Sequence, residues 1–301
     1  MHDLLSRPYW EYTATVAVVS AAVFLATRGR GTASTARVAA FACDLSIIAA
    51  VFAIYQHTVH YAHNHTKGAS DRAADIYHFE GRLHIPGELW VQNLVIHHPP
   101  VVKALNAYYA GVHLPLTICF VLWVLWFHRD AYPGVRNVLA MSTLACVLIQ
   151  TVPVAPPRLM PQFGFIDTAL AYGQSVYGPG GNEVAGQLAA MPSIHVAWAA
   201  IVAWYVYRLS TNPVRWVFVV HFFMTMFVIV ATANHWWADG AVAVAIVAAA
   251  IYVQSRIEAL RKGPAGGASG TDSTNRLRRD ERGADDRGTA GTAPSRPEAL
   301  T

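Results

Sequence analysis

The sequence predicts an all-α fold, a polytopic membrane helix bundle of about seven spans. Hydrophobic residues make up 54% of the 301 residues and charged residues only 13%, whereas soluble domains carry about 25% charged residues. Apolar runs long enough, or nearly so, to cross a hydrocarbon core (about 20 helical residues) recur along the chain. They lie at 9–27, 37–59, 106–127, 135–154, 191–209, 214–233 and 236–257.

The segments around these runs complete the predicted organisation. Residues 1–60 hold the first two runs and form an N-terminal pair of transmembrane helices. Within the polar stretch 60–105, residues 72–98 have the mixed charge and apolar spacing of a helix lying along the membrane interface. The loop 155–190 is rich in Pro and Gly and cannot form a regular helix. Aliphatic residues are almost absent from 263–301, which predicts a disordered tail.

Basic residues indicate how the spans are oriented. Counting turns through seven spans places one set of Arg and Lys on a single side: Arg28, Arg30, Arg37, Arg129, Arg136, Arg208, Arg215, Arg256, Arg261 and Lys262. The positive-inside rule makes that side cytoplasmic, with the C-terminal tail inside and both long loops outside. We therefore expect a multi-pass protein of the plasma membrane. The net charge of +4 reflects this topology and does not indicate nucleic acid binding.

Three short stretches at the outer ends of the apolar runs carry titratable groups. They are Ala155–Met160, Ala190–Val196 and Asn234–Gly240. A charge inside a membrane costs about 3 kcal/mol or more unless it is paired or hydrated, so such groups are functional candidates. Together they supply one Arg, two His and one Asp, which suffice to clamp a phosphate, attack it and protonate a leaving group. The sequence therefore predicts a membrane enzyme that acts on lipid phosphates.

His235 and Asp239 are spaced i, i+4, so on a helix that begins there they share one face and can form a hydrogen bond. A carboxylate on one imidazole nitrogen determines the tautomer and leaves the other nitrogen available as a nucleophile or base. The alternative is an interfacial histidine beside Trp236 and Trp237 in an aromatic belt.

Ser193 and His195 follow Pro192, a residue that suits the first turn of a helix. The free amides and the Ser193 hydroxyl at such a helix start can bind an anion. We expect His195 to face the same pocket as His235, so that one imidazole attacks and the other acts as an acid. The alternative is a histidine with a purely structural role.

Arg158 follows Pro156 and Pro157, which end the fourth run and hold the chain extended. A guanidinium group binds phosphate oxygens in a bidentate fork, the usual charge-neutralising role in phosphoryl transfer. The alternative is an interfacial arginine whose side chain extends to lipid headgroups.

These residues together resemble the type 2 phosphatidic acid phosphatase superfamily. Its signatures are a basic stretch ending in Arg-Pro, a Pro-Ser-Gly-His, and a His followed four residues later by Asp. The matching residues are Arg158 for the first, Ser193 and His195 for the second, and His235 and Asp239 for the third. Ile194 replaces the glycine, as in the branch similar to fungal inositol phosphorylceramide synthases and their bacterial relatives. The resemblance extends from about Asp75 to Tyr252, and includes Asn106, H-L-P at 113–115 and G-F-I-D-T at 164–168.

The resemblance implies a six-helix phosphatidic-acid-phosphatase-like core within a catalytic membrane domain over 61–262. It implies that His235 forms a phospho-histidine, that Asp239 orients it, and that His195 protonates the leaving alcohol. By the same resemblance, Arg158 and Ser193 hold the phosphate. The implied activity is transfer of a phospho-headgroup from a lipid to an alcohol such as inositol, with no metal or other cofactor. The alternative is hydrolysis of phosphatidic acid or polyprenyl phosphate.

Two cations of the superfamily pattern are missing, because Thr151 and Ile229 stand at their positions. Another cation from the long outer segment would compensate, and Arg82, Arg72 and Lys103 are the candidates. Glu80, two residues before Arg82, can also approach the phosphate pocket. Alternatively, the substrate is a phosphodiester with a single charge, which favours transfer over monoester hydrolysis.

Two other features allow rival interpretations. His57, His60, His63 and His65 at the outer end of the second run are spaced so that they could ligate a metal or haem, although polar caps at a membrane border are far commoner. A transporter would carry titratable groups in the middle of its spans, and Asp44 is the only clear charge there. We therefore rank a transporter or haem protein below an enzyme, and expect no metal site.

Overall fold

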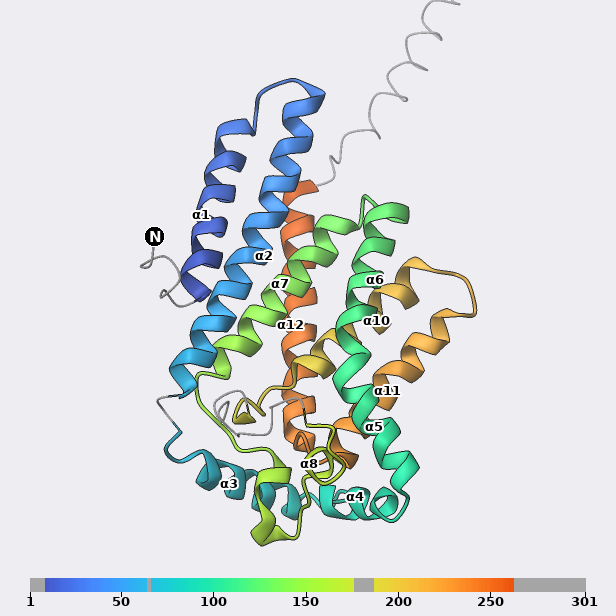
Figure 1. Cartoon of the computed structure of the whole chain (residues 1–301). Helices are drawn as coiled ribbons and strands as arrows, with labels where there is room; N and C mark the ends of the chain where they lie inside the picture. Colours follow the sequence, from blue (N-terminus) through green and yellow to red (C-terminus); the bar gives the residue numbers. More distant parts are fainter. Residues whose placement is uncertain (1–8, 64–65, 176–186, 263–301) are drawn as a thin grey trace, which may run out of the picture. The chain divides into compact units, whose positions relative to one another are not determined.

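A computed structural model describes residues 9–63, 66–175 and 187–262 (Figure 1). The chain forms two units, residues 1–254 and 255–301, and the architecture below is that of the first. Its described residues form helices joined by loops, with one isolated parallel bridge between Val154 and Ala189 and no strand. The all-α prediction is therefore confirmed for these residues. The tail predicted over 263–301 lies outside the described residues.

Four helices are long and apolar enough to cross a membrane: α1 (Tyr9–Thr27), α2 (Ala33–His63), α7 (Tyr132–Ile149) and α12 (Trp237–Lys262). A fifth crossing is obtained if α5 (Pro99–Gly111) and α6 (His113–Phe127) are counted together. Two further apolar helices are shorter, α10 (Ile194–Leu209) and α11 (Arg215–Ala231). A helix thus occupies each of the seven apolar runs, and the described helices are those of a multi-pass membrane protein.

The prediction of one continuous span over 106–127 is wrong. α5 ends at Gly111, α6 begins at His113, and the two helices meet at a bend of 46°. Pro115 accounts for the break, because proline has no amide hydrogen and its ring would clash with the carbonyl of Gly111 in a continuous helix. Proline is tolerated in the first turn of a helix, where α6 places it.

The predicted interfacial helix over 72–98 is two helices, α3 (Ala69–Arg82) and α4 (Glu88–Ile96). Pro86 lies in the connection, and a proline disfavours helical backbone in the residue before it. In Figure 1, α3 and α4 lie across the lower ends of the long helices.

The Pro- and Gly-rich loop after α7 has no long helix in its described part, as expected. It contains only short turns of helix, η2 (Pro157–Leu159), η3 (Pro161–Phe163) and α8 (Thr168–Ala171). In Figure 1, this loop lies at the same end of the first unit as α3 and α4, while the α1–α2 and α6–α7 connections lie at the other end.

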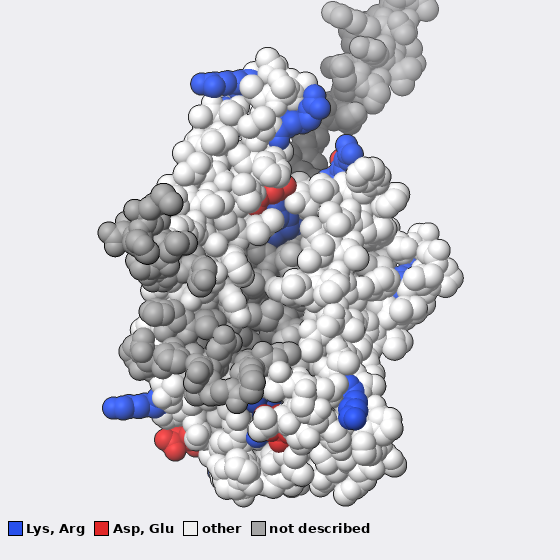
Figure 2. Space-filling model, viewed as in Figure 1, with Lys and Arg blue, Asp and Glu red and all other residues white. Residues whose placement is uncertain are grey.

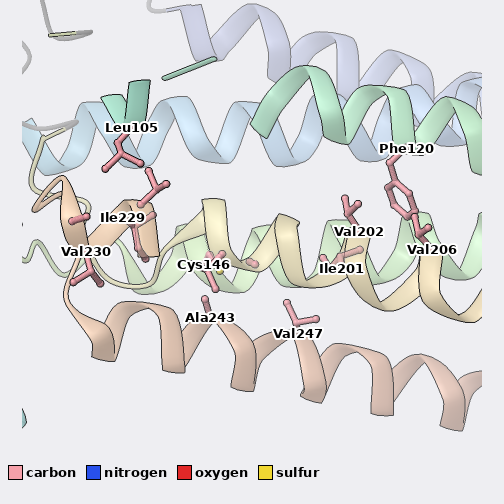
Figure 3. Packing of buried hydrophobic residues seen from close by; sticks show 14 of the residues in the cluster. Leu105, Phe120, Cys146, Ile201, Val202, Val206, Ile229, Val230, Ala243 and Val247 are labelled. Atoms are coloured by element: carbon pink, nitrogen blue, oxygen red, sulfur yellow. The ribbon is translucent and has the colours of Figure 1, made fainter. Parts of the chain in front are cut away.

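The main hydrophobic core is built around α10 (Figure 3). Ile201, Val202 and Val206 of α10 are all buried. They belong to one cluster with buried residues of the neighbouring helices, among them Phe120 of α6, Cys146 of α7, and Ala243 and Val247 of α12. The central position of α10 explains how this short helix remains within the bundle.

A second buried cluster anchors the loops at the end that carries α3 and α4. Its members are Ala69, Ala73, Val154, Ala155, Met160, Phe165, Leu188, Ala190, Ala233 and Trp236. Trp236 is fully buried, and its indole Nε1 donates a hydrogen bond of 2.9 Å to the carbonyl of Ala155. Tyr77 of α3 stacks on Phe163, with ring centres 4.3 Å apart. The three stretches that carry the candidate catalytic residues are thus packed on one small core.

Charged side chains on the visible face gather toward the two ends of the first unit (Figure 2). Between them the surface is mostly uncharged, apart from one adjacent pair of opposite charges and one basic group near the right edge of the view. Large hydrophobic side chains are exposed on several helices, for example Phe41, Trp126 and Val220. An apolar band between charged ends is the surface expected of a protein that crosses a membrane.

Replacing Ile201 by Ala should lower the stability of the bundle by about 2–5 kcal/mol, because it leaves a cavity in the α10 core. Ile118→Ala is the matched control, since Ile118 of α6 is 49% exposed and its truncation opens no cavity. Thermal unfolding of both variants in detergent measures the difference. Equal losses for the two variants would contradict the central role of α10.

Candidate active site

Backbone hydrogen bonds bring the three candidate stretches together. The amide of Arg158 donates to the carbonyl of Ala233 at 2.8 Å, and the amide of Ser193 donates to the carbonyl of Asp239 at 3.2 Å. Ala233 has a φ of 54°, in the left-handed region that residues with a side chain rarely adopt. This turn separates α11 from the segment that carries His235. Because these hydrogen bonds join main-chain atoms, they determine the relative positions of the three stretches independently of the side chains.

His235 lies just before α12, which begins at Trp237, so the expectation that His235 is part of this helix is wrong. The predicted hydrogen bond is nevertheless present. The Nδ1 atom lies 2.7 Å from the carbonyl oxygen of Ala190 and 3.2 Å from Oδ2 of Asp239. Both neighbours are acceptors, so Nδ1 carries the hydrogen and Nε2 keeps its lone pair. The Nε2 atom is buried and has no hydrogen-bond partner in the described part of the chain.

Asp239 is fully buried in the first turn of α12. Its Oδ2 atom also accepts the amide of Trp236 at 3.0 Å, so one carboxylate oxygen serves both the histidine and the backbone. A negative charge is favoured at the N-terminus of a helix by the helix dipole. The position thus stabilises an anion that in turn orients the imidazole of His235.

His195 lies in the first turn of α10 and faces His235. The centres of the two rings are 5.9 Å apart. Tyr109 of α5 and His113 of α6 flank His195, with ring centres at 4.5 Å and 4.8 Å. The two histidines predicted to share a pocket are therefore neighbours, and the break between α5 and α6 places two further rings beside them.

Ser193 is the N-cap of α10, and its Oγ atom accepts the amide of Val196 at 3.4 Å. The residue is fully buried. It lines neither the cavity that contains His195 nor the pocket that contains Arg158. The geometry thus shows Ser193 shaping the start of α10, and its expected contact with phosphate stays a prediction.

Arg158 is buried and its guanidinium contacts three side chains. Nη1 lies 2.8 Å from Oδ2 of Asp167 and 3.1 Å from Oε1 of Gln187, and Nε donates to Oδ1 of Asn234 at 3.1 Å. Asn234 directly precedes His235, so the arginine is connected to the nucleophile candidate through one residue. The pocket that Arg158 lines has a volume of only about 10 Å³, space for about one water molecule.

Three residues in this arrangement had no assigned role in the sequence analysis. Tyr109 lines both the Arg158 pocket and the larger cavity that contains His195. Asp167 and Asn234 hold the guanidinium of Arg158. Asp167 lies within the G-F-I-D-T stretch, and Asn234 adjoins His235, so both had a sequence signal. Tyr109 had none, because it lies on α5, far along the chain from every candidate stretch.

Glu80 and Arg82 occupy different environments from the one expected. Glu80 is buried, its Oε1 accepts the amide of Ala238 at 2.6 Å, and it lines a separate cavity between α3 and α4. Arg82 is exposed in the last turn of α3. Neither residue lines the pockets that contain His195 and Arg158. Glu80 thus supports the start of α12, and no contact of Arg82 in the described chain links it to phosphate binding.

The other candidate cations also have structural partners. Arg72 donates through Nε to the carbonyl of Pro153 at 2.7 Å, and the ammonium of Lys103 lies 5.7 Å from the ring centre of Tyr172. At the position of a missing cation, the backbone carbonyl of Ile229 accepts the amides of Asn234 and His235. Among the described residues, Arg158 is therefore the one Arg or Lys that lines the small pocket beside Asn234, while Arg136 lines the larger cavity and is paired with Asp44.

The predicted histidine cluster is described only at His57, whose ring packs edge-on against Trp10 with centres 5.0 Å apart. The side chains of His60, His63 and His65 lie outside the described residues. Among the residues that the structure does describe, no group of three or more His, Cys, Asp or Glu is arranged to hold a metal ion.

Comparison with protein-family models finds a match to the model described as the PAP2 superfamily, over residues 74–253. Comparison with curated proteins and with solved structures finds no match. The matched segment begins in α3 and ends in α12, so it contains all the candidate catalytic residues but neither α1 nor α2.

Replacing Glu80 by Gln should remove a pH dependence of stability. Burial, followed by the contact with Glu88, raises the pKa of Glu80 from 4.5 to about 9. The unfolded chain releases this proton near pH 4.5, whereas the folded chain retains it, so wild-type stability should fall as the pH rises from about 5 to 9, by at most about 1.4 kcal/mol per pH unit.

The glutamine keeps an oxygen for the amide of Ala238 but does not titrate, so Glu80→Gln should lack this slope. Thermal unfolding in detergent between pH 5 and pH 9 provides the comparison. Parallel pH profiles for the two proteins would show that Glu80 is ionised in the folded protein and would contradict the assignment.

Proposed function

Since the chain belongs to the PAP2 superfamily, we propose that it is an integral-membrane enzyme that breaks a lipid phosphoester through a phospho-histidine intermediate. Membership alone indicates a membrane protein of the phosphatase or phosphotransferase type. One observation carries the finer proposal. His235 has its Nδ1 hydrogen held by Asp239 and Ala190, while its Nε2 lone pair is unpartnered in the described chain and close to a second histidine.

In the first step, Nε2 of His235 attacks phosphorus. The nitrogen–phosphorus bond forms as the bond to the lipid alcohol breaks, and His195 gives its proton to the departing oxygen. The centres of the two rings are 5.9 Å apart, so a phosphate group bound at His235 lies beside His195, which can then reach the departing oxygen. Asp239 stabilises the positive charge that develops on the His235 ring.

In the second step, water or an alcohol attacks the phospho-histidine. His195, now neutral, takes the proton of the attacking hydroxyl, and the nitrogen–phosphorus bond breaks. Water yields a phosphatase, whereas a polyol such as inositol yields a transferase. Both outcomes use the same groups, because the two half-reactions are chemically symmetric.

Transfer of a phospho-headgroup from a lipid phosphodiester is the activity we favour. In the described chain, Arg158 is the only Arg or Lys that lines the small pocket beside Asn234, and Asp167 already neutralises part of its charge. Arg136, which lines the larger cavity, is itself paired with Asp44. A phosphodiester has a single negative charge and needs less neutralisation than the dianion of a phosphomonoester. Hydrolysis of phosphatidic acid or polyprenyl phosphate is the alternative. In either case Asp167 has to yield Nη1 of Arg158 to the phosphate.

We place the active site on the extracytoplasmic side of the plasma membrane and the C-terminus in the cytoplasm. The support is the distribution of Arg and Lys in the short connections of the chain. Ser193 and Arg158 remain the proposed phosphate ligands, and no metal or other cofactor takes part in the proposed steps.

His235→Ala and His195→Ala should each reduce turnover by orders of magnitude while the bundle stays folded, because each removes a group that acts on the reacting atoms. The measurement is mass spectrometry of the products formed from labelled phosphatidylinositol, phosphatidic acid and polyprenyl phosphate by the purified protein. A phosphorylated acceptor indicates transfer. Release of inorganic phosphate from a monoester, or of inositol phosphate from phosphatidylinositol, indicates hydrolysis. Near-full activity of either variant on the true substrate would overturn the assigned roles.

Treatment with EDTA should leave turnover unchanged, because the proposed steps use only protein groups to supply positive charge and protons. The assay is the same product analysis before and after chelation and after addition of Mg²⁺ or Mn²⁺. Loss of activity on chelation with recovery on adding either ion would contradict the metal-free mechanism.

A further inference from the structure

A large cavity extends away from His195 into the apolar part of the bundle. Its volume is about 590 Å³, within the range of pockets that hold whole small-molecule ligands. Tyr109, His113 and His195 line it, so the cavity is continuous with the candidate active site. Most of the other lining residues are aliphatic or aromatic. Its polar groups thus include the three that lie beside the proposed reaction, Tyr109, His113 and His195.

Two long helices, α2 and α7, form a large part of the cavity wall. α2 contributes Ile47, Ile48, Val51, Phe52 and Tyr55, whose spacing places them on one face of that helix. α7 lines the cavity from Tyr132 to Thr143, which corresponds to about 16 Å along its axis. That length is close to half of the roughly 30 Å hydrocarbon core, the depth that the chains of one leaflet occupy.

An ion pair connects α2 and α7 at the end of the cavity opposite His195. Nη1 of Arg136 lies 2.5 Å from Oδ1 of Asp44, and the hydroxyl of Tyr132 donates to Oδ2 of Asp44 at 3.1 Å. Arg136 and Tyr132 both line the cavity. Asp44 was the only clear charge in the middle of a predicted span, and this pairing accounts for it. The pair therefore holds the two walls together and closes the cavity with a neutralised polar group.

One side of the cavity is open to the surroundings of the bundle. Ile48 and Phe52 line it and are 61% and 48% exposed. In a membrane these side chains face lipid, so a hydrocarbon chain can enter from the bilayer without crossing water. The helix that carries them, α2, lies outside the segment 74–253 that matches the superfamily.

We propose that this cavity, the acyl-chain chamber, holds an acyl chain of the lipid whose phosphoester reaches His235, and that α2 determines which chain lengths fit. The inference rests on the proposed function, because it identifies the chain as part of the alcohol that His195 protonates. An acyl chain suits the chamber because its length matches one leaflet. A polyprenyl chain is considerably longer and would project beyond the ion pair.

Ala140→Phe tests the chamber, because Ala140 of α7 lines it between Arg136 and Thr143, so a bulky side chain there narrows the path toward the ion pair. Ala40→Phe is the matched control: Ala40 is exposed on α2 and does not line the chamber. The probes are phosphatidylinositol with two eighteen-carbon chains and with two eight-carbon chains, presented at a fixed mole fraction in detergent micelles. The readout is diacylglycerol release, which is the same for hydrolysis and transfer.

For Ala140→Phe, KM for the long-chain probe should rise about tenfold or more, the loss expected when two methylene groups can no longer be buried. KM for the short-chain probe should change less than about twofold, since such a chain ends before the obstruction. Ala40→Phe should change neither value. Equal effects of Ala140→Phe on both probes, or no effect on either, would overturn the chamber.

A second measurement does not depend on turnover. Long-chain phosphatidylinositol with a diazirine at mid-chain should label residues 47–55 and 132–143 on illumination. Excess unlabelled long-chain phosphatidylinositol should suppress this labelling, and Ala140→Phe should weaken it. Labelling that no competitor suppresses would identify bulk membrane lipid and contradict a specific chamber.

The two measurements separate the two proposals. Specific labelling without any diacylglycerol release would refute the proposed function but would still support an acyl-chain chamber. Turnover of both probes with unchanged kinetics and labelling in Ala140→Phe would refute the chamber and leave the function standing.

Discussion

The buried start of α12 is the constraint on which the candidate site depends. The first amides of a helix have no partner within it, and away from water each one needs another acceptor. Three carboxyl groups meet this need for the amides of residues 236–238, namely those of Asp239, Glu88 and Glu80. The two glutamates come from α4 and α3, so the outer helices are bound to the helix that carries the candidate catalytic aspartate. A buried helix end thus explains why a membrane protein maintains so many acidic groups at one place.

The same constraint determines the state of His235. Asp239 accepts a backbone amide and the imidazole through one oxygen, so the aspartate cannot rotate away from the histidine without exposing an unpaired amide. The imidazole is therefore held in one tautomer before any substrate binds. Preorganisation of this kind costs nothing at the moment of reaction, because folding has already ordered the groups. The same contacts of Asp239 therefore serve both the stability of the bundle and the proposed chemistry.

The N-terminal hairpin of α1 and α2 contributes to the chamber but not to the candidate catalytic residues. The superfamily segment contains every candidate catalytic residue, whereas α2 supplies one wall of the acyl-chain chamber. Asp44 and Arg136 attach α2 to α7, and each neutralises a charge that would be costly alone in an apolar environment. Chemistry and lipid selection are accordingly carried by different parts of the chain in this proposal, so the hairpin can change without disturbing His235 or His195.

The sequence by itself determined the helical class, the apolar runs, and the pairing of His235 with Asp239, because these depend on composition and on spacing within a few residues. Pro115 and Pro86 were also visible in it, yet whether each proline kinks a helix or ends one depends on the packing around it, so the breaks at α5–α6 and α3–α4 were not predicted. Only the tertiary structure brought Tyr109 beside His195, Asp167 onto Arg158, and Glu80 under α12. Tyr109 and Glu80 lie far along the chain from their partners, and Asp167 reaches Arg158 only through the irregular path of a loop, so no local pattern encodes these contacts.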